Sequence, residues 1–323
     1  MQSPELSIIM LSFNSESFIR EAIRSILNQT FRDFELIVID NGSSDHTISI
    51  IESFNDTRIN LYRNDPNTGI AISRNQGLSI AKGQFLACFD SDDIAHPNKF
   101  EKQLDFLRKN DEFGFAGTAV KLIDSRGKVI ARWKLRAKPE IVPFIMLFHN
   151  YFVNSAVVFK RSVLGELRYR EDLEIGEDYY LWWQLLQKSK ALNLPEYLTL
   201  YRQHKTSQMA LKNAGRPEHD KRVYELIFRK PEFDINSEDM EVHLKLKDQG
   251  RIKTFREIKA HKHWLLKIWN HYSVEKNKVR YLKKTIYNRW MKVGYKSRRK
   301  VLIMLRVIFD FSFYYKLFVK QKA

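Results

Sequence analysis

The sequence predicts an α/β fold in which a mostly parallel sheet is flanked by helices, followed by a basic, helical C-terminal extension. Three observations lead to this prediction. Short apolar runs rich in Ile and Val recur along the first part of the chain, and amphipathic segments lie between them. This alternation is typical of βαβ units with right-handed crossovers. From about residue 215 the chain becomes basic and aromatic, with a helix-like pattern.

The first part of the chain supplies the strands and helices of these βαβ units in order. Continuous apolar runs predict buried strands at 6–11, 35–40, 58–62 and 84–90. Helices are expected at 18–27, where apolar residues recur along one face, at 71–81, and at 97–109, where Pro97 can occupy the first turn.

The pattern changes after residue 112. Two extended segments flank Asp124-Ser125-Arg126-Gly127, which reads as a hairpin turn. We further expect a strand at 154–160, a helix at 177–190 and an extended segment at 191–201. The predicted domains are residues 1–208 and a mainly helical region over residues 209–323, with the boundary placed by the change in charge.

The net charge of +17 is unevenly distributed. Residues 215–323 hold 28 Lys and Arg against 12 Asp and Glu, whereas the first 214 residues hold 27 against 26. A basic region can meet an anionic membrane surface, nucleic acid or an acidic ligand. The chain has one cysteine, Cys88, which suits a reducing cytosol, and its first residues do not resemble a signal peptide.

Acidic side chains follow two of the predicted strands. Ligands of open parallel sheets bind beyond the carboxyl ends of the strands, where these acids would lie. The first cluster, residues 40–45, begins with Asp40 and contains Gly42. A turn and helix cap would explain Ser44 and Asp45, but not Asp40 at the strand end.

The second cluster is Asp90-Ser91-Asp92-Asp93, which follows the apolar run ending at Phe89. Because alternate residues of an extended segment share a side, Asp90 and Asp92 could converge while Asp93 points elsewhere. Oxygen ligands of this kind suit Mg²⁺ or Mn²⁺, which usually also bind substrate phosphates. A solvated acidic turn is the alternative for a DxD motif taken alone.

Two further positions are candidates for chemistry. Glu177 and Asp178 open the helix expected at 177–190. Acids at a helix N-terminus favour the helix dipole, which suffices for Glu177, whereas Asp178 could act as a general base. His204 would matter only if its loop folds back over the acidic site.

These motifs, in this order, resemble the inverting family 2 glycosyltransferases of the GT-A fold. The resemblance covers residues 5–208 and rests on the following stretches: "SIIMLSFNSESFIREAIRSILNQTF", "ELIVIDNGSSDHT", "NTGIAISRNQGLSIAKGQFLACFDSDDIAHPNKFEKQ", "GEDYYLWWQL" and "LYRQHKTSQ". It implies an enzyme that moves a sugar from a nucleotide donor, UDP-linked in the usual case, to an acceptor.

The resemblance also implies roles for the donor side of the site. Ser12 and Asn14 would border the nucleotide, and Asp40 would bind its base. Asp90 would hold the ribose. Arg74 and Asn75 occupy the position of the family's "RN" pair beside the nucleotide.

For the chemistry, the resemblance implies three roles. Asp92 would bind the metal that bridges the diphosphate, and His204 would supply a further metal or diphosphate contact. Asp178 aligns with the catalytic base. A carboxylate that takes the proton of a sugar hydroxyl typically contributes 10²–10⁴-fold to the rate.

The chain departs from the family pattern in two places. Asn41 stands where the family often has a second acid. No QxxRW sequence is present, which argues against a processive polymerase. The C-terminal third carries no recognised family motif.

The basic C-terminal region has several interpretations. Residues 301–319 are almost wholly apolar but contain Arg306 and Asp310, so an interfacial helix next to Arg298 and Arg299 is favoured over a spanning one. A helix buried against the rest of the protein or a partner is nearly as good an explanation. Nucleic-acid binding is not favoured, because no recognition motif accompanies the charge.

The sequence therefore predicts a metal-dependent, non-processive inverting glycosyltransferase at the inner face of the cell membrane. Its acceptor would be a glycan or a lipid-linked oligosaccharide. A sugar nucleotidylyltransferase is the first alternative, but it would need a Gly-rich loop where this chain has "LSFNSESF". A non-enzymatic membrane- or nucleic-acid-binding module is the second, and it would leave Asp40, Asp92 and Asp178 unexplained.

Overall fold

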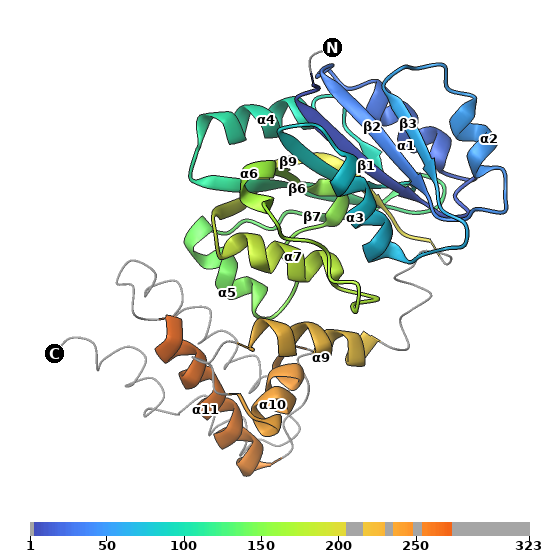
Figure 1. The fold of residues 1–323 in the computed structure, drawn as a ribbon. Helices are drawn as coiled ribbons and strands as arrows, with labels where there is room; N and C mark the ends of the chain where they lie inside the picture. The colour runs from blue at the N-terminus through green and yellow to red at the C-terminus, as the bar shows by residue number, and fades with distance from the viewer. Residues whose placement is uncertain (1–2, 205–215, 230–234, 248–253, 273–323) are drawn as a thin grey trace. The chain divides into compact units, whose positions relative to one another are not determined.

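The computed structural model describes residues 3–204, 216–229, 235–247 and 254–272 (Figure 1). The chain divides into two compact units. The first unit is Met1–Pro139 with Asn150–Val223, and the second is Glu140–His149 with Tyr224–Ala323. The domain boundary expected after residue 208 remains a prediction.

The first unit is built on a mixed sheet. Its strand order is β3-β2-β1-β4-β8-β6-β9-β5, with β7 paired to β6. The strands among the described residues are β1 (Leu6–Ser12), β2 (Phe34–Asp40), β3 (Ile59–Arg63), β4 (Phe85–Asp90), β5 (Ile94–Ala95), β6 (Phe113–Ile123), β7 (Val129–Trp133), β8 (Val158–Lys160) and β9 (Lys190–Arg202). Strands β3, β2, β1 and β4 are parallel, as the apolar runs predicted.

Helices pack on both faces of the mixed sheet. They are α1 (Ile19–Leu27), α2 (Thr47–Glu52), α3 (Ile70–Ile80), α4 (Lys99–Lys109), α6 (Arg161–Leu164) and α7 (Glu177–Leu186). One buried cluster joins α1 and α4 to alternate residues of β1, β2 and β4. On α3, Gly77 allows close approach to the sheet, because a Cβ there would lie 2.4 Å from Ile9 Cγ2.

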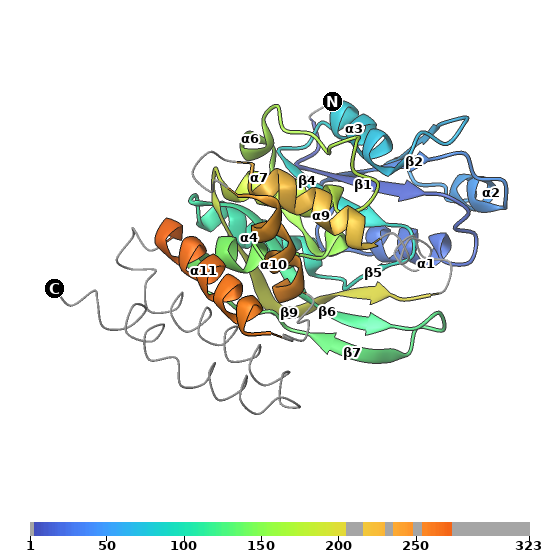
Figure 2. The same cartoon turned by 90° about the horizontal axis from the view of Figure 1, so that it is seen from below.

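The second half of the sheet is antiparallel except at β6 and β9. Strand β8 runs antiparallel to both β4 and β6, and the expected hairpin joins β6 to β7. Strands β9, β6 and β7 lie side by side in Figure 2. Helix α4 begins at Lys99, two residues later than expected. The strand expected over 154–160 opens as a short 3₁₀ helix, Asn154–Ala156.

The described part of the second unit is helical. It contains α5 (Val142–Met146), α10 (Ser237–Lys247), α11 (Phe255–Tyr272) and the end of α9 (Arg216–Ile227). Its buried centre includes His243, whose Nδ1 lies 3.2 Å from Trp264 Nε1. Among the described residues, no helix is both long and apolar enough to span a bilayer. The segment 301–319, for which an interfacial helix was expected, lies outside the described residues.

Candidate active site

The carboxyl ends of the parallel strands bring the predicted acids to one edge of the sheet. Ser12 of β1 pairs in register with Asp40 of β2, and Leu11 pairs with Asp90 of β4. The three strand ends are therefore adjacent, which is where a parallel sheet binds its ligands.

At the end of β2, the chain itself bonds both carboxylate oxygens of Asp40. Its Oδ1 accepts hydrogen bonds from Ser12 Oγ at 3.0 Å and from Ser43 Oγ at 2.6 Å. Its Oδ2 accepts the Ser43 backbone N–H at 3.0 Å. Asp40 is fully buried, so Ser12 and Asp40 form the floor of this strand end. Contact between Asp40 and a nucleotide base remains a prediction.

Asn41, which replaces the family's second acid, holds the loop that follows β3. Its Nδ2 donates to Asn67 Oδ1 at 2.7 Å, and its Oδ1 accepts the Thr68 N–H at 3.1 Å. The amide thus supplies a donor and an acceptor together, which a carboxylate could not do. Where the family often has a second carboxylate, this chain therefore has an amide with a structural role.

The loop after β1 is fixed by polar contacts to both acidic segments. Asn14 has a positive φ of 48°, and its Oδ1 accepts the Ser44 N–H at 2.9 Å. Ser15 Oγ lies 2.8 Å from Ser91 Oγ, within the DxD segment. Asn14 therefore shapes the rim of the β1 and β2 ends, and Ser15 connects that rim to the end of β4.

A buried arginine links three elements around Asp90. Arg74 of α3 donates to Asp90 Oδ1 at 3.1 Å and forms an ion pair with Glu177, the first residue of α7. Burial disfavours its charge, but Glu177 and Asp90 outweigh that effect and raise the pKa of Arg74. Asn154 also donates to Asp90 Oδ1, at 3.0 Å. The Arg74–Glu177 pair fixes the start of α7 against the end of β4.

Asp178 follows Glu177 directly and is only half-buried. Its Oδ2 accepts a hydrogen bond from Asn150 at 3.3 Å. Burial raises the pKa of Asp178 to about 7, and the neighbouring Glu177 carboxylate adds to the rise. A carboxylate with a pKa near neutrality is well matched to accept a proton from a hydroxyl group.

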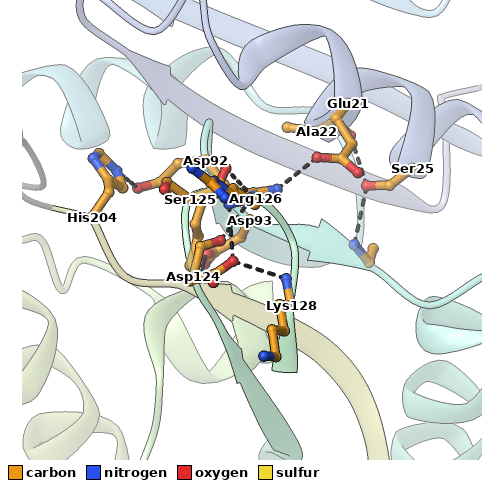
Figure 3. A network of polar contacts seen from close by, with 12 residues as sticks. Glu21, Ala22, Ser25, Asp92, Asp93, Asp124, Ser125, Arg126, Lys128 and His204 are labelled. Carbon is orange, nitrogen blue, oxygen red and sulfur yellow. Dashed lines mark hydrogen bonds and ion pairs between the residues drawn. The ribbon is translucent and has the colours of Figure 1, made fainter. Parts of the chain in front are cut away.

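The DxD segment contacts the end of β9. Asp92 Oδ2 lies 2.9 Å from His204 Nε2, and Figure 3 shows the two side chains pointing toward one another. Asp93 points elsewhere, as expected: it is fully buried, and its Oδ1 accepts the Arg202 N–H at 2.8 Å. Burial and the Asp92 charge raise the pKa of Asp93 well above its usual value.

Arg202 organises this part of the site. Its Nε donates to the Asp92 carbonyl at 2.7 Å, and its Nη2 donates to Glu21 of α1 at 2.6 Å. Its Nη1 donates to the carbonyls of Asp124 and Ser125 at 3.2 and 3.3 Å. One buried side chain thus joins the DxD segment, α1 and the β6–β7 hairpin.

The donor set around Asp92 is compatible with a divalent cation. No group of three or more potential metal-ligating side chains occurs within the described residues. Asp92 and His204 could provide two ligands, and Mg²⁺ typically takes only one or two carboxylates and completes its shell with phosphates and water. The residues therefore fit a metal that arrives with a diphosphate rather than a closed protein cage.

Asn75 uses its amide on the protein backbone. Its Nδ2 donates to the Tyr169 carbonyl at 2.9 Å, and its Oδ1 accepts the Tyr169 N–H at 2.9 Å. The Tyr169 ring lies under the Arg74 guanidinium at 5.4 Å, and its hydroxyl lies 3.0 Å from Cys88 Sγ. Burial raises the pKa of Cys88 to about 11, so this thiol stays neutral. Asn75 thus supports the residue beneath Arg74, and a nucleotide contact remains a prediction.

Sequence reasoning missed Arg202, Asn150 and Asn154, and explained Glu177 only as a helix-terminal acid. Arg202 gave one usable signal, because it is a lone arginine at the end of an extended segment, two residues before His204. No signal in the sequence marks Asn150 or Asn154, because each donates a hydrogen bond to a residue far away in the chain.

The chain is similar to named glycosyltransferases along most of its length. A family model described as "Glycosyl transferase family 2" matches residues 7–168. An uncharacterized glycosyltransferase of Haemophilus influenzae is 33% identical over 232 residues, which are 68% of this chain and 72% of the relative. The Escherichia coli UDP-Glc:alpha-D-GlcNAc-diphosphoundecaprenol beta-1,3-glucosyltransferase WfgD is 34% identical over 208 residues, which are 62% of this chain and 78% of WfgD.

Solved structures share the fold. S. aureus TarS 1–349 in complex with UDP-GlcNAc matches with a TM-score of 0.61 at 18% identity, covering 94% of this chain and 90% of that one. Of a longer TarS chain, the match covers 54%. The mannosyltransferase PcManGT from Pyrobaculum calidifontis, in complex with GDP-Man and Mn²⁺, matches with a TM-score of 0.57 at 15% identity, covering 96% and 88%. Together with the sequence matches, this fold and its acidic strand ends establish that the chain belongs to glycosyl transferase family 2 and is a glycosyltransferase of the GT-A fold.

Proposed function

We propose that this glycosyltransferase moves a sugar from a UDP-linked donor to a lipid-linked glycan with inversion at the anomeric carbon. The proposal rests on the position of Arg74 between the candidate nucleotide site and the candidate base. This residue joins Asp90, at the nucleotide side, to Glu177, next to Asp178. A base on one side of the anomeric carbon and a stabilised leaving group on the other give one in-line displacement.

The residues would share the reaction as follows. Asp178 would accept the proton of the acceptor hydroxyl at its partly exposed carboxylate. Asp40, Asp90 and the loop at Asn14 would orient the nucleotide. A divalent cation held by Asp92 and His204, Mn²⁺ or Mg²⁺, would supply charge neutralisation for the departing diphosphate, an effect worth several kcal/mol.

The relatives support the donor and acceptor classes. WfgD is named for UDP-Glc and a diphosphoundecaprenol-linked acceptor, and the TarS and PcManGT structures hold UDP-GlcNAc and GDP-Man. The family match favours this proposal over a nucleotidylyltransferase or a non-enzymatic module. We further propose a peripheral position at the inner membrane face, to which the basic C-terminal region contributes. If so, deleting 297–323 would reduce binding to anionic vesicles without abolishing UDP binding.

A thermal-shift panel of UDP-sugars and GDP-mannose, with and without Mn²⁺, tests the donor and the metal. At 100 times its Kd, the right donor adds about 2.7 kcal/mol of stability. Asp92→Asn should abolish the Mn²⁺-dependent part of the shift while the unliganded protein still folds. The matched control is Asp172→Asn, an exposed acid paired with Arg170, which should keep the full shift. Normal Mn²⁺-dependent donor binding in Asp92→Asn would remove Asp92 from the site.

A further inference from the structure

The hairpin strand β7 and its flanks form an unusually basic stretch of the first unit. Residues 121–138 contain one acid and seven basic residues: Lys121, Arg126, Lys128, Arg132, Lys134, Arg136 and Lys138. All of these basic side chains except Lys121 are exposed. The near-neutral total charge of the first 214 residues therefore conceals a local concentration of positive charge.

The same stretch exposes large apolar side chains. Of the seven exposed large hydrophobic residues in the described chain, four lie here: Val129 (40% exposed), Ile130 (53%), Trp133 (43%) and Leu135 (39%). Ile130 is the extra residue of a bulge, because Ala131 pairs with Leu122 whereas Val129 pairs with Ile123. Bulges re-aim side chains at sheet edges. We call residues 125–138 the β7 surface.

Most of the basic side chains of the β7 surface have no carboxylate partner among the described residues. In the part of the chain that the structure describes, Arg126, Lys128, Arg132 and Arg136 form no ion pair with a carboxylate. Lys134 lies over the Tyr197 ring at 5.4 Å and likewise has no carboxylate partner among the described residues. These cations are available to an anionic surface.

The backbone beneath these side chains is held in place. Asp124 Oδ1 accepts the N–H groups of Arg126 and Lys128, both at 2.9 Å, which fixes the turn. Tyr151 donates its hydroxyl to the Leu135 carbonyl at 2.7 Å. The β7 surface is thus presented by an ordered hairpin, which reduces the ordering cost of binding.

We propose that the β7 surface docks the catalytic unit on a bilayer rich in anionic lipid. Lys and Arg gain free energy near a negatively charged leaflet, and exposed Trp and aliphatic side chains enter the headgroup boundary. Aliphatic residues interleaved with basic ones meet both requirements. Through Arg202, the hairpin also contacts the DxD segment, so docking would hold the candidate metal site close to the lipid surface.

Two other occupants fit the observations less well. A second copy of the chain could pair with the β7 edge, but its own basic residues would then face these, and like charges across strands destabilise pairing. Single-stranded RNA would use the charge and Trp133, but it would leave Val129, Ile130 and Leu135 without a function, because RNA is read by stacking and polar contacts.

The first test measures binding of the full chain to vesicles of phosphatidylcholine with 25% phosphatidylglycerol. Each basic residue at such a surface contributes about fivefold, so the triple variant Arg126→Gln, Lys128→Gln, Arg136→Gln should raise Kd roughly 100-fold. The control triple is Lys82→Gln, Lys109→Gln, Lys188→Gln. These exposed lysines precede β4, β6 and β9 and so lie at the strand ends opposite the β6–β7 turn. Equal losses in the two triple variants would overturn the proposal.

The second test locates the contact itself. Cys88 is buried, so a thiol-reactive, polarity-sensitive fluorophore can be placed on Ile130→Cys, with Lys188→Cys as the control. With anionic vesicles, emission should shift to the blue at 130 and stay unchanged at 188. No shift at 130 on vesicles that bind the protein would refute docking through this surface. A shift at 130 produced by RNA alone, or by concentration-dependent dimers without vesicles, would equally refute it. Neither test involves a sugar donor, so the outcomes are independent of the proposed transfer reaction.

Discussion

The two acidic strand ends of the first unit differ in how much of their hydrogen-bonding capacity the chain itself uses. At the end of β2, both oxygens of Asp40 are bonded to Ser12 and Ser43, and the residue is fully buried. At the end of β4, the Asp92 carboxylate has His204 as its only polar side-chain partner among the described residues, and part of it stays exposed. The β2 end is therefore structural, whereas the β4 end still has carboxylate oxygen available to bind a ligand.

Asp178, like Asp92, keeps part of its carboxylate exposed, and substituting it should have the largest effect on turnover. Asp178→Asn preserves size but cannot accept a proton, so turnover should fall at least 10²-fold. Donor affinity should stay within threefold. The melting temperature should not fall, because the unfavourable burial of this carboxylate outweighs the favourable effect of an acid in the first turn of α7.

Nucleotide release with acceptor present, measured beside a melting curve, checks this prediction. Asp172→Asn is the control, since it removes an exposed carboxylate of the same unit. A stable Asp178→Asn protein with full turnover would shift the role of base to another residue.

The pH profile sharpens the same comparison. Burial, and then Glu177, raise the pKa of Asp178 to about 7. The base must be ionised, so kcat/KM should rise about tenfold per pH unit below pH 7 and level off above it. The residual activity of Asp178→Asn should lack this inflection. An unchanged profile in the variant would assign the titration to a different group.

Asp40→Asn tests the structural role of the β2 end. Asparagine would place an N–H₂ group against donors that now point at a carboxylate, and a buried mismatch of this kind costs about 1–3 kcal/mol. We therefore expect a lower free energy of unfolding even without nucleotide, measured by urea denaturation. Asp65→Asn, at an exposed position, should be neutral. Equal stability of Asp40→Asn and the unchanged protein would mean that the buried network is not rigid.

Asn75→Ala should produce the smallest functional change. It removes two hydrogen bonds to the Tyr169 backbone, worth about 1 kcal/mol each. Stability should fall by about 1–2 kcal/mol, and the donor Kd, read by calorimetry, should change less than threefold. A tenfold loss of donor affinity at unchanged stability would instead support the nucleotide contact that the family resemblance implies.

Local patterns in the sequence predicted the parallel half of the fold well. Strands β1, β2 and β4 are continuous apolar runs because both faces are buried, and such runs are visible without any partner. The start of α4 was predicted less accurately: Pro97 suits a first turn, but the helix begins at Lys99. Residues 154–156 directly precede the apolar run of β8 but form a 3₁₀ helix, in which Asn154 and Ser155 bond to Asp90.

The candidate site was predictable in its acids but not in their arrangement. Asp90, Asp92 and Asp178 stand out by position in the sequence. Asp90 and Asp178 are connected through Arg74, which forms an ion pair with Glu177, 103 residues away. No periodicity in the sequence encodes such a contact. Similarly, the role of Arg202 depends on a carbonyl 110 residues earlier. Long-range polar contacts of this kind follow from the fold as a whole.

The way in which Arg202 reaches the β6–β7 hairpin has a consequence for protein engineering. The guanidinium binds the main-chain carbonyls of Asp124 and Ser125, which any amino acid could offer. Apart from Asp124 and Gly127, which shape the turn, the side chains of the hairpin tip can therefore be exchanged while the attachment to the DxD segment is kept. Within a scaffold of this kind, the surface that the enzyme presents to its surroundings can diversify independently of its chemistry.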